Sequence, residues 1–143
     1  MSELKIRTRA VGANAVLKGK ELPTITSETG GVINLVTSVS EPGFNPLDLL
    51  YASLSACIVL SARIAANRLK VADKLEEVRV HVTGEKSHGE PSRVARFDIA
   101  IEIDGDLDEA TKHQIVTLSE EICTVSNTLR GDAEFVTRLL VSG

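Results

Sequence analysis

Two cysteines, Cys57 and Cys123, are the side chains of this 143-residue chain best suited to covalent chemistry. A cysteine attacks as its thiolate, and a second thiol nearby can capture a sulfenic acid as a disulfide before further oxidation. The sequence has no Cys-x-x-Cys spacing, which disfavours a zinc site or a thioredoxin-type motif. The pair is therefore either a redox pair or two packed thiols, since free cysteine is commonly buried and inert.

Composition excludes several other classes of function. Aromatic residues make up 3% of the chain and Trp is absent, which disfavours nucleic-acid binding by base stacking. The net charge is −4, with no basic patch for phosphates. The histidines, His81, His88 and His113, have no metal-ligand spacing, so we expect no metal and no bound cofactor. With two cysteines and no apolar leader, we expect a cytoplasmic protein without membrane association.

The elements that carry the thiols are predicted as follows. Alternating residues and glycine turns predict strands within residues 1–40. A helix is predicted over about 46–69, because Asn45 is a good N-cap and Pro46 suits the first helical position. No residue from 49 to 62 is charged, which predicts burial on several sides. We expect a second copy of the chain to cover part of this helix, giving a homodimer.

In the second half of the chain, apolar and polar residues alternate more clearly. A hairpin is predicted over about 76–104, a second helix over about 108–123 and a last strand over about 134–141. The fold class is therefore α+β, a single domain over residues 1–143 with antiparallel sheets around a long buried central helix. Cys57 falls in the middle of the central helix and Cys123 at the end of the second.

Two strings resemble one known family. Residues 45–57, NPLDLLYASLSAC, are similar to the N-P/S-P-x-E-L-L-x-A-x-x-x-x-C helix of the OsmC/Ohr family, the osmotically inducible and organic hydroperoxide resistance proteins. Residues 123–129, CTVSNTL, resemble that family's C-P-V-S-N-x-L segment. The order of elements and the 66-residue separation of the cysteines fit as well, so the resemblance covers nearly the whole chain. Asp48 stands two places after the motif proline, Pro46. This P-x-acid pattern resembles that of the less characterised OsmC-like branch of the family.

The resemblance implies a fold and an activity. The family's fold is an OsmC-like intertwined homodimer with two long helices at its centre. Cys57 would be the peroxidatic cysteine of a peroxiredoxin-like oxidoreductase that reduces organic hydroperoxides in a stress response, and Cys123 the resolving cysteine. An external dithiol, in this family often a lipoylated protein, would reduce the Cys57–Cys123 disulfide.

The chain departs from the family's reductases at two places. Leu47 stands where those enzymes have Glu, and the nearest acid is Asp48, which is a candidate catalytic residue or a helix-capping residue. No Arg occurs between Ala10 and Ala62, the region that supplies the family's activating Arg. The basic residues that could replace it are Arg7, Arg9, Lys18, Lys20 and Arg130.

These departures leave other functions open. One is an OsmC-like homodimer that binds a small apolar molecule or senses redox state without efficient turnover. The other is a structural dimer whose two cysteines only pack.

Overall fold

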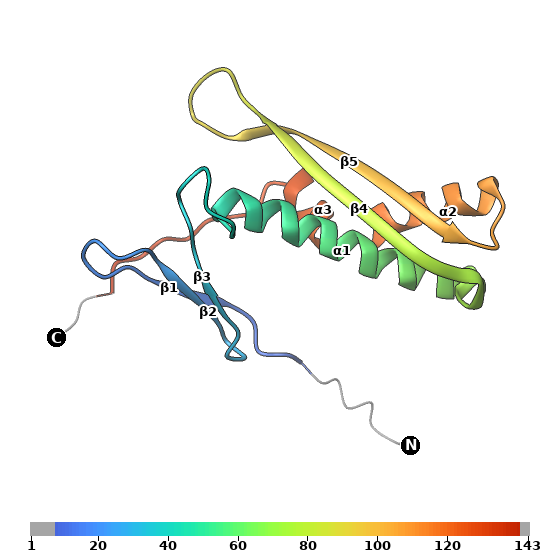
Figure 1. The fold of residues 1–143 in the computed structure, drawn as a ribbon, viewed down its shortest axis with the longest axis horizontal. Helices are drawn as coiled ribbons and strands as arrows, with labels where there is room; N and C mark the ends of the chain where they lie inside the picture. Colours follow the sequence, from blue (N-terminus) through green and yellow to red (C-terminus); the bar gives the residue numbers. More distant parts are fainter. Residues whose placement is uncertain (1–7, 141–143) are drawn as a thin grey trace. The chain divides into compact units, whose positions relative to one another are not determined.

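The computed structural model describes residues 8–140, which divide into two compact units between Leu49 and Leu50 (Figure 1). Antiparallel sheets combine with three α-helices, which confirms the predicted α+β class. The elements are, in chain order, β1 (Ala13–Val16), β2 (Thr24–Ser27), β3 (Val32–Asn34), α1 (Pro46–Arg68), a 3-10 turn (Ala72–Lys74), β4 (Leu75–Lys86), β5 (Val94–Gly105), α2 (Glu109–Ile122) and α3 (Thr124–Arg130).

The first unit contains a three-stranded antiparallel sheet in the order β1-β2-β3. Ile25 at its centre lies opposite Ala15 of β1 and Ile33 of β3. The turn between β2 and β3 passes through Gly30, whose φ of 99° is accessible mainly to glycine. A further strand expected around residues 4–8 lies almost wholly outside the described residues.

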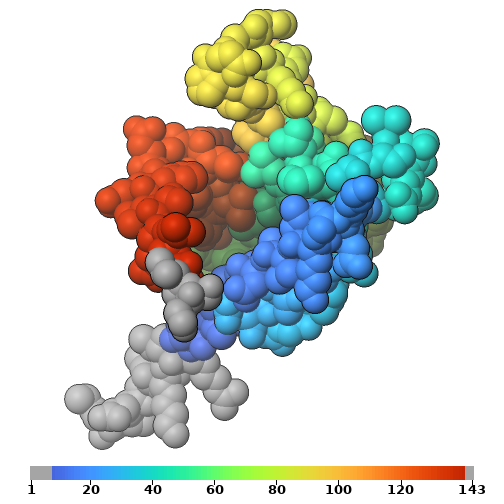
Figure 2. All heavy atoms as spheres, turned by 90° about the vertical axis from the view of Figure 1, so that its left-hand side faces the viewer, coloured from blue at the N-terminus to red at the C-terminus, as the bar shows by residue number. Residues whose placement is uncertain are grey.

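The second unit is built on a long antiparallel hairpin. In Figure 1 the β4–β5 ribbon lies along α1, and the turn that joins the strands projects away from the body of this unit, as Figure 2 also shows. Val80 pairs with Ile101 and Val82 with Ile99, so the apolar side chains of both strands share one face.

That apolar face packs on α1 through two clusters of buried residues. One contains the alanines of the C-terminal half of α1 with one isoleucine each from β5 and α2, namely Ala62, Ala65, Ala66, Ile103 and Ile115. The other lies toward the N-terminal half of α1 and contains Leu54, Ile58, Val82 and Cys123. The second cluster sets the surroundings of both cysteines.

Only one side of the helix α1 is buried within the single chain. Its buried residues are Leu54, Ile58, Ser61, Ala62, Ala65 and Ala66. Leu60 and Ile64, by contrast, are 51% and 42% exposed. The predicted burial on several sides is thus not met within one chain.

By length and composition α1 could also cross a membrane, with a mean hydropathy of 1.8 over its most apolar window. Core helices of soluble proteins meet the same description, and a third of that window is buried here. The expected lack of membrane association stays a prediction.

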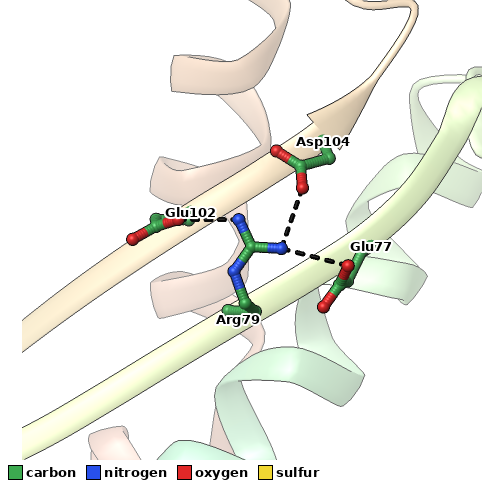
Figure 3. Close-up of polar contacts among 4 residues, drawn as sticks. All are labelled: Glu77, Arg79, Glu102 and Asp104. Atoms are coloured by element: carbon green, nitrogen blue, oxygen red, sulfur yellow. Dashed lines mark hydrogen bonds and ion pairs between the residues drawn. The ribbon is translucent and has the colours of Figure 1, made fainter.

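The solvent face of the hairpin carries a charge network centred on Arg79 (Figure 3). The guanidinium lies 2.7 Å from Glu102, 2.8 Å from Asp104 and 3.0 Å from Glu77. The hydrogen bonds that Arg79 donates to Asp104, Glu102 and Glu77 raise its pKa, and the guanidinium in turn lowers the pKa of Asp104. Since Glu77 faces Asp104 and Arg79 faces Glu102, the network favours the observed register.

The C-terminal part of the chain differs from the sequence prediction. The last strand predicted over about 134–141 is wrong for residues 134–140, which form neither strand nor helix; residue 141 lies outside the described residues. A strand requires backbone partners, and within residues 8–140 of one chain this segment pairs with no strand. Phe135 and Leu139 on it are 89% and 90% exposed.

Candidate active site

Both cysteines belong to the second unit, and their side chains meet there. Cys57 lies in the middle of α1 and is half-buried, whereas Cys123, between α2 and α3, is fully buried. Cys57 packs against the cluster that contains Cys123. Each thiol is among the groups that shift the pKa of the other. The structure therefore brings together the two residues that the sequence singled out.

The environment of Cys57 favours its thiolate. Burial raises the pKa of this thiol, but hydrogen bonds from the Val125 N–H, the Cys123 thiol, the Ser61 hydroxyl and the Thr124 N–H together lower it below its ordinary value. A hydrogen bond to a charged form stabilises that form, which is the cause of the shift. A lowered pKa increases the fraction of the Cys57 thiol that is ionised at a given pH.

The environment of Cys123 has the opposite effect. Burial raises the pKa of this thiol, and the hydrogen bond and negative charge of Cys57 raise it further. The Ser126 N–H, which lies 3.3 Å from the sulfur, only partly offsets the rise. The pKa of Cys123 is therefore raised while that of Cys57 is lowered, so Cys57 is the more acidic of the two thiols.

A break in the helix explains how Cys123 reaches α1. The helix predicted over about 108–123 ends at Ile122, because Cys123 adopts an extended backbone with φ −63° and ψ 108°. Its N–H still donates to the Ser119 carbonyl, at 2.9 Å, and α3 starts at the next residue. The break presents the amides of Thr124 and Val125 to Cys57, a feature that the sequence did not reveal.

The surroundings of the thiols are mainly apolar. Tyr51 and Phe97 make an edge-to-face contact with ring centroids 6.2 Å apart. A Cβ at Gly84 would lie 2.7 Å from the Tyr51 hydroxyl, so only glycine allows this aromatic pair to sit against β4. A pocket of about 200 Å³ adjoins the cluster and is lined by Leu54, Phe97, Ile99, Ser126, Leu129 and Arg130.

Asp48 has a structural role at the start of α1. Its carboxylate accepts a hydrogen bond from the Asn45 N–H at 3.0 Å, and the Asn45 side chain accepts one from the Asp48 N–H at 2.8 Å. This reciprocal pair is a capping box in which Asp replaces the more common Glu. It explains an acid at this position, and the catalytic role of Asp48 stays a prediction.

The candidate activating cations have other partners, are exposed to solvent, or lie outside the described residues. Arg130 donates to Glu120 at 3.4 Å, and Arg9 donates to Thr29 at 2.8 Å. Lys18 and Lys20 are exposed, and Arg7 lies outside the described residues. In the described part of the chain, no basic side chain is among the principal causes of the lowered thiol pKa.

Comparison with known proteins identifies the family. The model of the OsmC-like protein family matches residues 39–138, so this chain belongs to the OsmC-like family, as the two motif strings predicted. Cys57 and Cys123 both fall within the matched region. A comparison with curated proteins found no match.

Solved structures share the fold. The OsmC-like protein from Mycoplasma pneumoniae is 22% identical with a TM-score of 0.74, over 87% of this chain and 90% of its own. The organic hydroperoxide resistance protein OsmC from Legionella pneumophila is 21% identical with a TM-score of 0.66, over 88% and 93% of the two chains. The organic hydroperoxide resistance protein OhrB of Bacillus subtilis is 22% identical with a TM-score of 0.59, over 85% and 91%.

Proposed function

We propose that this protein is a thiol-dependent peroxidase that reduces organic hydroperoxides, with Cys57 as the nucleophile and Cys123 as the resolving thiol. The observation that carries the proposal is the packing of Cys57 of α1 against the cluster that contains Cys123. The pKa of Cys57 is lowered by its hydrogen bonds and that of Cys123 is raised by burial, so Cys57 is the more acidic of the two thiols. Two relatives with the same fold are named organic hydroperoxide resistance proteins, which supports the same substrate class.

The first chemical step consumes the hydroperoxide. The Cys57 thiolate attacks the distal oxygen of R–O–O–H, the O–O bond breaks, and the electron pair leaves on R–O⁻. The alkoxide takes a proton to become the alcohol R–OH, and the sulfur becomes sulfenic acid, Cys57–S–OH. The apolar walls around Cys57 suit a bulky organic R group.

The second step forms the disulfide. The Cys123 sulfur attacks the sulfenic sulfur, the S–OH bond breaks, and the hydroxide leaves with the proton of the Cys123 thiol as water. An external dithiol then returns both cysteines to thiols and is itself oxidised to a disulfide. A lipoylated protein is the proposed reductant, and no bound cofactor takes part in this scheme.

The proposed assembly is a homodimer. Leu60 and Ile64 form an exposed apolar strip on α1, and such a strip on a core helix is best explained by a covering surface. The neighbouring groove is lined by Val59, Leu60, Arg63, Asn67, Ala72, Leu75, Glu76, Glu77 and Val78. We propose a cytoplasmic location, where reductants keep the two thiols reduced between turnovers.

A second candidate function is supported by one observation. In the described residues, backbone amides and neutral side chains activate Cys57 in place of a basic side chain, and they orient a peroxide less strongly than a guanidinium would. This favours a redox sensor with little turnover, or a dimer that binds a small apolar molecule.

Peroxide titration tests the proposal. The reduced protein is mixed with one equivalent of cumene hydroperoxide or tert-butyl hydroperoxide, and disulfide formation is followed by intact mass and peptide mapping. We expect a stoichiometric Cys57–Cys123 disulfide in the wild type and none in Cys57→Ser. Repeated turnover with a dithiol present separates a peroxidase from a sensor, and thiols that stay reduced for hours would exclude both.

A further inference from the structure

Ser61 lies one helical turn after Cys57 on α1. Side chains four residues apart share one face of a helix, with their Cβ atoms about 5–6 Å apart. Ser61 is only 3% exposed, and its hydroxyl can both donate and accept a hydrogen bond. A buried hydroxyl needs a hydrogen-bond partner, and the spacing along α1 places the Cys57 side chain next to it.

Other serines of α1 use their hydroxyls differently. Ser53 donates to the Leu50 carbonyl at 2.8 Å, and Ser55 donates to the Ala52 carbonyl at 3.0 Å. These are local bonds to the preceding turn and involve no cysteine. Burial raises the pKa of Cys57, and the Ser61 hydroxyl is one of the groups that lower this pKa.

We propose that Ser61 is a further residue of the reactive site, whose hydroxyl donates a hydrogen bond to the Cys57 thiolate and so stabilises part of its negative charge. The proposal rests on Cys57 being the reactive thiol of the proposed peroxidase. A rotating hydroxyl also suits both states of the sulfur, because it can donate to the thiolate and accept from the S–OH group of the sulfenic acid. No proton is transferred between the two residues.

The test measures the pH dependence of Cys57 alkylation by iodoacetamide, read at the Cys57 peptide. Loss of a hydrogen bond to a charged group typically lowers the thiolate fraction, so we expect Ser61→Ala to react about 3- to 10-fold more slowly at pH 7, with the profile displaced to higher pH. Ser61→Thr keeps the hydroxyl and should restore the wild-type profile. Ser55→Ala, the matched control on the same helix, should stay within about twofold of the wild type.

Two results would overturn the proposal. One is a Ser61→Ala profile identical to that of the wild type, and the other is an equal displacement in Ser55→Ala. Circular dichroism confirms that each variant is folded before alkylation.

The outcome is separate from that of the peroxide titration, since alkylation needs no hydroperoxide. A protein that forms no disulfide, yet shows the displaced Ser61→Ala profile, retains the role of Ser61 and loses the proposed peroxidase function. A protein that forms the disulfide, but whose Ser61→Ala variant is alkylated like the wild type, retains the proposed peroxidase function and loses the role of Ser61.

Discussion

The sulfur of Cys123 caps α3, because it accepts a hydrogen bond from the Ser126 N–H at 3.3 Å. A residue proposed to resolve the sulfenic acid is thus also part of the local fold. Serine at position 123 keeps a capping atom, whereas alanine removes it. This difference separates the chemical role of Cys123 from its structural one.

The first prediction concerns Cys123→Ser. We expect this variant to fold with a stability within about 1 kcal/mol of the wild type, because serine is a good N-cap. With one equivalent of hydroperoxide it should form Cys57 sulfenic acid without an intramolecular disulfide, and excess peroxide should convert it to sulfinic acid. Dimedone trapping and intact mass report these species. A normal intramolecular disulfide in this variant is impossible, so rapid recovery of a thiol without added reductant would contradict the scheme.

The second prediction concerns Gly84. Gly84→Ala should destabilise the protein by about 1–3 kcal/mol in urea denaturation, because the added Cβ would lie 2.7 Å from the Tyr51 hydroxyl and 2.8 Å from a Val94 methyl. Gly89→Ala is the control, since a Cβ there meets nothing within 4 Å. Adding Tyr51→Phe should recover part of the loss. Equal effects at the two glycines would mean that the contact with Tyr51 and Val94 does not set the cost.

The third prediction concerns pH and the Arg79 network. Because Arg79 lowers the pKa of Asp104, the stabilisation from this pair is present above the unfolded pKa of Asp104 and is lost as the pH falls through its lower folded pKa. Arg79→Gln should therefore reduce stability at neutral pH, and the difference from the wild type should shrink in strong acid. Arg96→Gln, whose nearest carboxylate is 3.6 Å away on Asp98, should have a smaller effect.

Denaturation curves from pH 7 down to about pH 2 measure this difference, and a two-dimensional NMR titration follows the Asp104 carboxyl directly. A difference that grows as the pH falls would reverse the predicted sign and exclude the network as its cause.

The fourth prediction concerns the apolar strip on α1. Leu60→Glu places a charge in the proposed dimer interface, and burying an unpaired charge is costly. Light scattering should then show a monomer or a dimer at least about tenfold weaker, which corresponds to about 1.4 kcal/mol. Gln114→Glu adds the same charge on the exposed face of α2 and should leave the assembly unchanged. A Leu60→Glu protein that remains fully dimeric would place the interface elsewhere.

The sequence predicted the features that depend on local patterns. The uncharged run over residues 49–62, the alternation of Val80, Val82 and Ile99, and the two cysteine motifs led to α1, the β4–β5 hairpin and the family. The helix-capping role of Asp48 could also be predicted, because it depends on Asn45, only three residues away.

Features without a distinctive sequence pattern were missed. The break at Cys123 depends on the backbone of a single residue, and the amides that it presents carry no side-chain signature. The prediction of a last strand was wrong because the alternation of apolar and polar residues shows that a segment can form a strand. It does not show which partner strand lies close enough to pair with it. Ser61 lacked a signal because a small polar residue on an apolar helix resembles a simple packing residue.

The amides of Thr124 and Val125 have a consequence for how this site responds to its surroundings and to mutation. Peptide groups are dipoles without net charge, so dissolved ions screen their attraction for a thiolate far less than they screen an exposed guanidinium. They also persist through substitution of the side chains that carry them. The lowered pKa of Cys57 should therefore vary little with ionic strength, and the sequence around α3 can diverge without loss of these two hydrogen bonds.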